Sequence, residues 1–161
     1  MNIKIISEDD YSGEFLKNVI AKLKDEKLVG NITVKGSKPM LPLCNSKLDR
    51  ILKAFDKTCD KILIILDSDE PQNREFRRTN VKRHVPKMTT PVEIILTDYE
   101  IEEWICFSKN LKWGQSKPSE ELKNQFGYKK SSLPRYAGDL DYDKLIKNSK
   151  SFIAFLNALQ P

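Results

Sequence analysis

The segment from Lys61 to Leu66 constrains this chain more than any other, because after Lys61 it is an unbroken apolar run from Ile62 to Leu66. Such a run is typical of a strand that is covered on both faces, as central strands of parallel sheets are. It ends abruptly in the acidic sequence Asp67-Ser68-Asp69-Glu70. The chain is therefore expected to build a sheet around this strand, with helices on either side of it.

Weaker patterns on both sides of this run support the same architecture. Alternating apolar residues predict three further strands, at 2–7, 31–35 and 92–96. Apolar residues at helical spacing predict helices at about 12–27, with Ser12 as N-cap, at 46–58, and just beyond Pro71. The segment from Gly36 to Cys44 contains two prolines and is predicted to be a loop. This alternation predicts an α/β fold of Rossmann-like type, with a mainly parallel sheet of four or slightly more strands and helices on both faces.

The last third of the chain differs from the rest. It carries patterns for two weak helices, at about 119–126 and 142–159, with a polar basic loop between them and no clear strand. At 161 residues one domain is the default expectation. We therefore expect a single domain over 1–161, with a core of about 1–110 and a helical C-terminal extension of about 111–161.

Composition excludes several classes of protein. No apolar run approaches the roughly 20 residues of a membrane helix, and the N-terminus leads into a strand rather than a signal peptide, so we expect a cytoplasmic protein. Cys44, Cys59 and Cys106 lack the paired spacing of a zinc site or a disulfide framework. His84 is the only histidine. Chemistry based on oxygen ligands and a hard metal ion is the simplest option that remains.

Acidic residues follow two of the predicted strands. Glu8 comes directly after the first strand, and Asp67 and Asp69 come after the central one. Groups placed just past the carboxyl ends of parallel strands converge on one crevice, and alternation would send Asp67 and Asp69 to one side while Ser68 points away. Carboxylates gathered in this way suit Mg²⁺, which prefers oxygen ligands. The alternative interpretation is that these acids only cap helices and form turns.

A net charge of +5 and a pI near 9.0 favour an anionic partner, and nucleic acid is the partner we expect. Several basic residues recur at helical spacing just after the acidic pair, where they could follow a phosphate backbone, although a solvated helix face explains them nearly as well. The candidate nucleic-acid-binding residues are Lys38, Arg74, Arg77, Arg78, Lys82 and Arg83. Lys129, Lys130 and Arg135 in the late basic loop are weaker candidates.

The pattern resembles the Toprim-like family, in particular the small proteins related to the overcoming-lysogenization-defect nucleases. The matching elements cover about two-thirds of the chain: Glu8 with Phe15-Leu16 in the following helix, Gly36 after the second strand, Asp67-Ser68-Asp69-Glu70 after the third, and Glu100-Ile101-Glu102-Glu103-Trp104 after the fourth.

This resemblance implies a metal-dependent nuclease that acts on DNA or RNA. It implies that Glu8 acts as general acid or base or as a metal ligand, that Asp67 and Asp69 hold Mg²⁺ or Mn²⁺, and that Glu102 helps with a second metal. In such a mechanism the cation lowers the pKa of the attacking water and offsets charge on the phosphate oxygens. A homodimer or a partner protein would be compatible with the same reading.

Two other functions stay open. In a receiver domain of two-component signalling, Asp67 would be the phosphoacceptor, Asp9 and Asp10 would hold Mg²⁺, and Lys117 would contact the phosphate. Thr97 after the fourth strand fits this pattern as well, but the segment 113–116 is a poor fifth strand. A non-catalytic nucleic-acid-binding regulatory protein would keep the fold and the basic face alone. Trp104 and Trp113 are candidates for core anchors or for stacking platforms under unpaired bases, and the core is the better assignment for Trp104.

Overall fold

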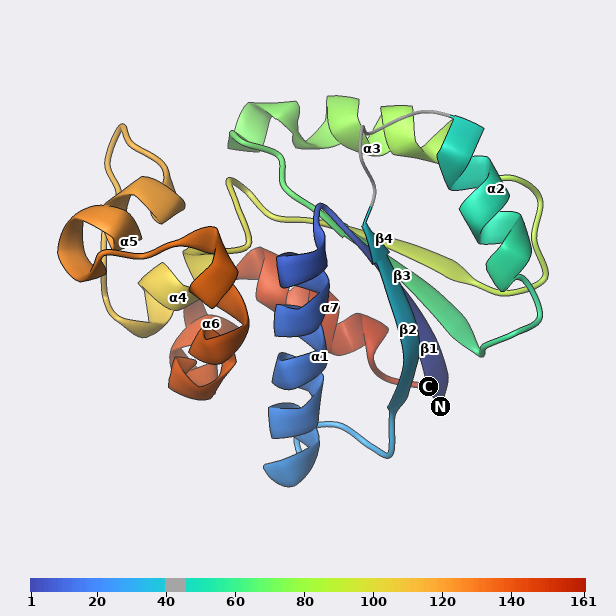
Figure 1. The fold of residues 1–161 in the computed structure, drawn as a ribbon, viewed down its shortest axis with the longest axis horizontal. Coiled ribbons are helices and arrows are strands. Elements are labelled where there is room, and N and C mark those ends of the chain that lie inside the picture. Colours follow the sequence, from blue (N-terminus) through green and yellow to red (C-terminus); the bar gives the residue numbers. More distant parts are fainter. Residues whose placement is uncertain (40–45) are drawn as a thin grey trace.

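The fold is a four-stranded, all-parallel sheet with helices on both faces, as the computed structural model shows for residues 1–39 and 46–161 (Figure 1). The strand order is β2-β1-β3-β4. The strands are β1 (Asn2–Ser7), β2 (Thr33–Pro39), β3 (Lys61–Leu66) and β4 (Val92–Leu96). The predicted α/β class with a C-terminal helical part is thus confirmed.

Strand β3 lies between β1 and β4. Ser7 of β1 pairs with Ile65, and Leu66 pairs with Leu96 of β4, so the carboxyl ends of the three strands lie at one edge of the sheet. The residues that follow these ends are Glu8, Asp67 and Thr97. The parallel register therefore brings together groups that are up to ninety residues apart in the chain.

The two faces of β3 belong to two separate apolar cores. Leu63 and Ile65 join the core formed with helix α1 (Asp10–Asp25) and the C-terminal third, whereas Ile62, Ile64 and Leu66 join the core on the other face. Helices α2 (Ser46–Phe55) and α3 (Arg74–Lys82) cover that second face, and a short 3₁₀ turn, Pro71–Asn73, precedes α3 (Figure 1). Burial on both faces explains why the sequence of β3 is apolar throughout.

The C-terminal third packs beside α1. It consists of α4 (Glu103–Ser108), α5 (Pro118–Phe126), a 3₁₀ segment (Lys130–Asp139), α6 (Tyr142–Asn148) and α7 (Lys150–Ala158) (Figure 1). Trp104 of α4 is fully buried, with its ring centroid 5.1 Å from that of Phe152 and 5.2 Å from that of Phe155. These contacts confirm Trp104 as a core anchor.

Several sequence-based boundaries were wrong, and α2 ends at Phe55 rather than at residue 58. Helix α1 is capped by Asp9, whose Oδ1 accepts from the Ser12 amide at 2.8 Å, so Ser12 lies within the first turn. Strand β2 continues through Gly36 to Pro39, because pairing with β1 satisfies its backbone; the rest of the predicted loop lies outside the described residues. The last helix is split, because Ser149 has extended backbone and caps α7 through Phe152.

Helix α1 begins very close to the sheet. A Cβ atom added at Gly13 would lie 3.0 Å from Oγ of Ser7 and 3.1 Å from Oγ of Ser37. These distances are shorter than ordinary van der Waals contacts, so even a methyl group would require the Ser7 and Ser37 side chains to shift by a few tenths of an ångström. Glycine thus allows α1, and with it Asp9, to begin close to the carboxyl end of β1.

No helix in the described ranges combines the length and apolar character that crossing a membrane requires.

Candidate functional site

A pocket of about 230 Å³ lies at the carboxyl ends of β1 and β3. Four carboxylates and one guanidinium line it: Glu8, Asp9, Asp67, Asp69 and Arg77. The structure thus brings Glu8 together with Asp67 and Asp69, as expected from the parallel sheet. The pocket also contains two groups outside the predicted catalytic trio, Asp9 and Arg77.

Glu8 connects the two strand ends directly. Its Oε1 accepts a hydrogen bond from the backbone amide of Asp67 at 2.9 Å and one from the guanidinium of Arg77 at 2.6 Å. The Glu8 and Arg77 side chains are only 17% and 14% exposed, so this ion pair is largely withdrawn from water. The carboxylate is therefore held in one orientation, with its second oxygen left for another partner.

Asp67 is held from the other side of the site. Its Oδ1 accepts from the backbone amide of Ile101 at 2.9 Å and from the Thr97 hydroxyl at 3.4 Å. Burial, together with the neighbouring carboxylates of Glu102 and Glu8, raises the pKa of Asp67 well above its usual range. A positive charge placed near Asp67 would reverse this shift, because it would stabilise the ionised form.

Asp69 departs from the extended path expected after β3. Its φ is +64°, a left-handed conformation, and its amide donates to the Tyr99 carbonyl at 2.9 Å. Its carboxylate is half-exposed and lies 3.3 Å from Nζ of Lys117 and 3.7 Å from Arg77. A hydrogen bond to Asp69 and its negative charge raise the pKa of Lys117. Asp67 and Asp69 thus have different partners, although both line one pocket.

The guanidinium of Arg77 is the cation that joins two of the predicted metal ligands. It contacts both Glu8 and Asp69. Among residues 1–39 and 46–161 no group of three or more His, Cys, Asp or Glu side chains is arranged to hold a metal ion. In this structure, the positive charge between Glu8 and Asp69 is the guanidinium of Arg77.

Glu102 lies behind Asp67 and is 1% exposed. Its Oε1 accepts from the Tyr128 hydroxyl at 2.7 Å and from Nζ of Lys130 at 2.9 Å, while its Oε2 is buried without a hydrogen-bond partner. Lys130 also lies 3.5 Å from Asp9. Burial alone would lower the pKa of Lys130, but the charges of Glu102, Asp67 and Asp9 outweigh burial and raise it. Lys130 therefore stays charged and links Glu102 to the pocket.

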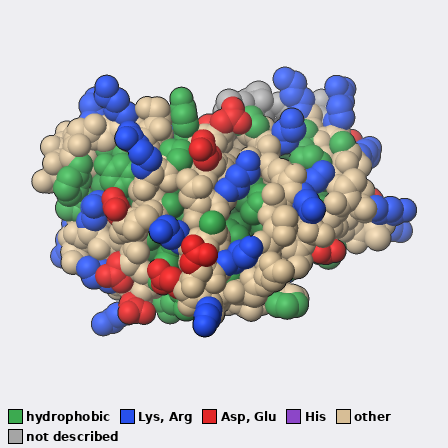
Figure 2. Space-filling view, turned by 60° about the horizontal axis from the view of Figure 1, so that its bottom comes forward, with side chains coloured by type: hydrophobic (Ala, Val, Ile, Leu, Met, Phe, Trp, Pro, Cys, Tyr) green, Lys and Arg blue, Asp and Glu red, His purple; other side chains and the backbone are tan. Residues whose placement is uncertain are grey.

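The candidate nucleic-acid-binding residues fall into two groups. Arg74 pairs with Asp98 at 2.7 Å, Arg77 pairs with Glu8, and Arg78 donates to the Ile94 carbonyl at 2.8 Å, so these three are engaged within the protein. Lys38, Lys82 and Arg83 are exposed. Acidic and basic side chains are interspersed on the face shown in Figure 2, which lacks a large patch of either sign.

The residues of the receiver pattern are only partly assembled. Thr97 contacts Asp67, but Lys117 contacts Asp69 instead. Residues 113–116 form a turn, and no strand follows β4 in the part of the chain that the structure describes. Lys130, from the 3₁₀ segment, acts on Asp67 through its positive charge, but its direct ion pairs are with Asp9 and Glu102.

Sequence reasoning gave little weight to Lys130, and it considered Tyr128 only as one of five tyrosines that could be nucleophiles by residue type. Both reach the site from the region after α5, which has no periodic pattern that would place its side chains. Their one sequence signal is a basic and aromatic cluster, Tyr128-Lys129-Lys130, that follows Gly127. Such a cluster does not predict where its side chains point.

Comparison with known proteins gave no match: no family model, no curated protein and no solved structure matches this chain. The Toprim-like resemblance therefore stays a prediction, and the function below is argued from the geometry of the site.

Proposed function

We propose that this protein binds Mg²⁺ or Mn²⁺ at the carboxyl ends of β1 and β3 and uses it for phosphodiester hydrolysis on nucleic acid, as a Toprim-like nuclease. The observation that carries the proposal is the convergence of Glu8, Asp67 and Asp69 on one pocket from two neighbouring strands. Clusters of titratable groups with shifted pKa values, in a crevice at strand ends, are typical of catalytic sites.

The donor atoms are carboxylate oxygens, which a divalent cation prefers, although the described side chains do not stand in a preassembled metal site. Burial and the repulsion from Glu102 and Glu8 raise the pKa of Asp67, and a cation would relieve this repulsion. Glu102 has a buried oxygen without a partner in the same region. The ligands would be Glu8, Asp67 and Asp69, with Glu102 as a candidate ligand for a second ion. A bound cation would supply Lewis acidity and a water of lowered pKa.

The residues of the chain then have separate tasks. The Asp67 amide and Arg77 fix the orientation of Glu8, and the Ile101 amide fixes that of Asp67. With Glu8 and Asp69 as ligands of a cation, Arg77 would be free to pair with a phosphate, for which its planar guanidinium is well suited. Exposed Lys38, Lys82 and Arg83 would add charge along the approach of a strand.

The cellular setting is part of the proposal. A cytoplasmic location is consistent with the free thiols of Cys59 and Cys106. A homodimer or a partner protein could complete the nucleic-acid surface, since the basic residues of α3 are largely engaged within the protein.

The test is incubation of the purified protein with end-labelled DNA and RNA, each single- and double-stranded, in Mg²⁺, Mn²⁺ or EDTA. We expect cleavage that requires metal. Asp67→Asn and Asp69→Asn should each reduce the rate by on the order of 10²-fold or more, because each removes a negatively charged metal ligand. Asp143→Asn is the matched control, because Asp143 is exposed on α6, away from the pocket, and its variant should cleave at the unchanged rate.

Three results would overturn the proposal. The first is the absence of cleavage of every substrate with either metal. The second is equal loss of activity in Asp143→Asn. The third is incorporation of phosphate at Asp67 from acetyl phosphate, which would favour the receiver function.

A further inference from the structure

A second pocket, of about 580 Å³, is connected to the proposed catalytic site through a polar pocket that shares residues with both. Three aromatic side chains line it, Tyr99, Phe107 and Trp113, together with the amides Asn110 and Asn148. We propose that this aromatic pocket binds an unpaired nucleobase, so that the substrate is single-stranded nucleic acid or an unpaired end. The inference rests on the proposed function, because it names the substrate class of that same site.

The aromatic rings form an open wall. The ring centroid of Trp113 lies 5.4 Å from that of Tyr99 and 5.5 Å from that of Phe107, both in edge-to-face geometry. Trp113 is only partly buried, in contrast with Trp104 in the core. Edge-to-face packing holds the indole while leaving ring surface in the pocket, and any base can stack on such a surface, because every base has a π-face.

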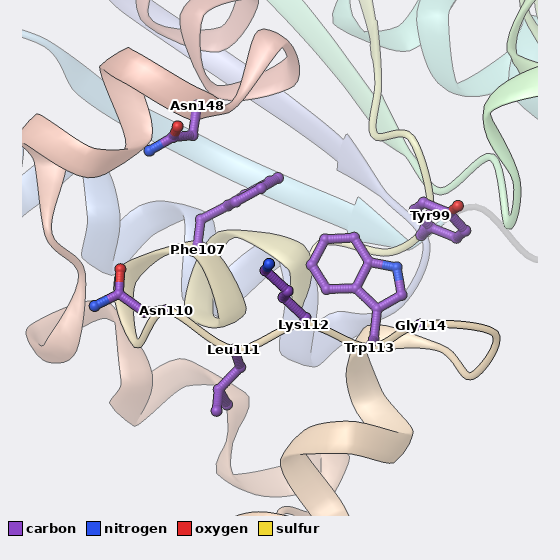
Figure 3. Close-up of a pocket in the computed structure, with 8 residues that line it drawn as sticks. All are labelled: Tyr99, Phe107, Asn110, Leu111, Lys112, Trp113, Gly114 and Asn148. Atoms are coloured by element: carbon purple, nitrogen blue, oxygen red, sulfur yellow. The ribbon is translucent and has the colours of Figure 1, made fainter.

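Two amides lie at the opposite end of the pocket from Tyr99 (Figure 3). The Asn148 Nδ2 donates to the Lys144 carbonyl at 2.8 Å, which leaves Oδ1 as an acceptor. The side-chain amide of Asn110 makes no hydrogen bond to any described residue, although its backbone amide donates to the Phe107 carbonyl at 3.3 Å. Amide groups of this kind can bond the Watson–Crick edge of a base, and that edge is accessible only when the base is unpaired.

The aromatic pocket leads to the carboxylates. It shares Tyr99 and Gly114 with a polar pocket of about 360 Å³, which is also lined by Lys117 and by Asp69 of the catalytic pocket. The Tyr99 carbonyl accepts from the Asp69 amide, so the aromatic wall is tied to the end of β3. A strand with a base beside Trp113 would thus pass Lys117 before it reaches Asp69, and Lys117 would meet its phosphate.

Gly114 shapes the connection between the two pockets. Its φ is +56°, which side chains rarely allow, and the chain turns there from Trp113 toward Lys117. The turn at Gly114 places the Trp113 ring on one side and the Lys117 ammonium group on the other. This arrangement suits a nucleic-acid strand, in which bases and phosphates alternate.

The binding test uses EDTA, so that it is independent of cleavage. The chain has two tryptophans, and Trp104 is buried, so quenching by a stacked base reports on Trp113. We expect a short single-stranded oligonucleotide to quench the emission saturably, and Trp113→Phe to abolish the quenching. The duplex of the same sequence should not quench it. A response to a nucleoside monophosphate without one to the oligonucleotide would overturn the assignment to a strand.

Affinity for a labelled single strand gives a second readout. Trp113→Ala should weaken binding about tenfold, through the loss of one stacked base, and Asn110→Gly about fivefold. Asn110→Gly also serves if Trp113→Ala fails to fold, because the Asn110 side chain is exposed and its φ of +56° is one that glycine adopts freely. Phe126→Ala is the matched control, since Phe126 is an exposed aromatic outside the pocket, and its affinity should be unchanged. Equal affinities of all variants would overturn the inference.

Cleavage assays separate the two proposals. If Asp67→Asn abolishes cleavage while Trp113→Ala cleaves single strands with unchanged KM, the proposed function stands and the base pocket is wrong. If the wild-type protein cleaves nothing, yet a single strand quenches Trp113, the pocket stands and the hydrolytic function is wrong.

Discussion

The guanidinium of Arg77 lies 2.6 Å from Oε1 of Glu8, so helix α3 is tied to the end of β1 through the pocket itself. A cation from the protein thus pairs with carboxylates that are proposed to bind a metal ion. An ion that enters must compete with Arg77 for Glu8 and Asp69, and this competition makes Arg77 the most informative position to change.

Arg77→Ala should lower the stability of the metal-free protein by about 1 to 2 kcal/mol, because it leaves the largely buried Glu8 carboxylate without its partner. Mg²⁺ should then raise the melting temperature of the variant more than that of the wild type, because no guanidinium competes with the ion for Glu8 and Asp69. Thermal unfolding with and without MgCl₂ measures both effects. Equal responses to Mg²⁺ in the two proteins would show that Arg77 does not compete with the ion.

Asp9 caps the N-terminus of α1, and this role can be separated from its charge. Asp9→Ala should cost about 1 kcal/mol, because the N-cap bond to the Ser12 amide is lost. Asp9→Asn should keep that stability, since asparagine caps equally well. Urea unfolding of both variants tests this, with Asp10→Ala as control, because Asp10 is exposed and is not the cap. A cleavage defect in Asp9→Asn at normal stability would assign its charge to the site.

Lys130 and Glu102 should depend on each other. Lys130→Met should destabilise the fold by about 2 to 3 kcal/mol, because the buried Glu102 carboxylate loses its counter-charge. Combining it with Glu102→Gln should recover much of this loss, because the uncompensated charge is removed as well. A double-mutant cycle from chemical denaturation gives the coupling energy. Additive losses would mean that the two groups do not interact in solution.

The raised pKa of Glu103 predicts that the stability of the fold depends on pH. Burial raises this pKa from 4.5 to about 7. Between these values the folded state holds a proton that the unfolded state has lost, so stability falls as pH rises through this window and levels off above it. The shift corresponds to about 3 kcal/mol. Asp67, whose pKa is also raised, acts in the same direction.

Unfolding free energies at about pH 5, 6, 7 and 8 measure this slope, with Glu103→Gln as the comparison. The glutamine variant should show a clearly smaller slope, whatever its absolute stability. Its absolute stability will also reflect the bonds that Glu103 accepts from the Tyr99 amide and the Ser151 hydroxyl. A slope of unchanged size would mean that Glu103 titrates near its ordinary value.

The sequence by itself determined the sheet. The fold class followed from the apolar run of β3 and the alternation in β1 and β4, because local periodicity distinguishes strands from helices. The edge at which Glu8, Asp67 and Asp69 meet followed from the acids directly after two strands, because parallel pairing brings the carboxyl ends of strands together. The sequence also placed Trp104 in the core through its apolar neighbours.

Only the tertiary structure decided what surrounds those acids. Arg77 turns toward Glu8, Lys130 reaches Glu102 from a segment without periodicity, and Asp69 leaves the strand path through a left-handed residue. The opening beside Trp113 likewise depends on rings from three segments. Side-chain direction and long-range charge pairing depend on how distant segments pack, and a pattern of three or four residues contains no information about that packing.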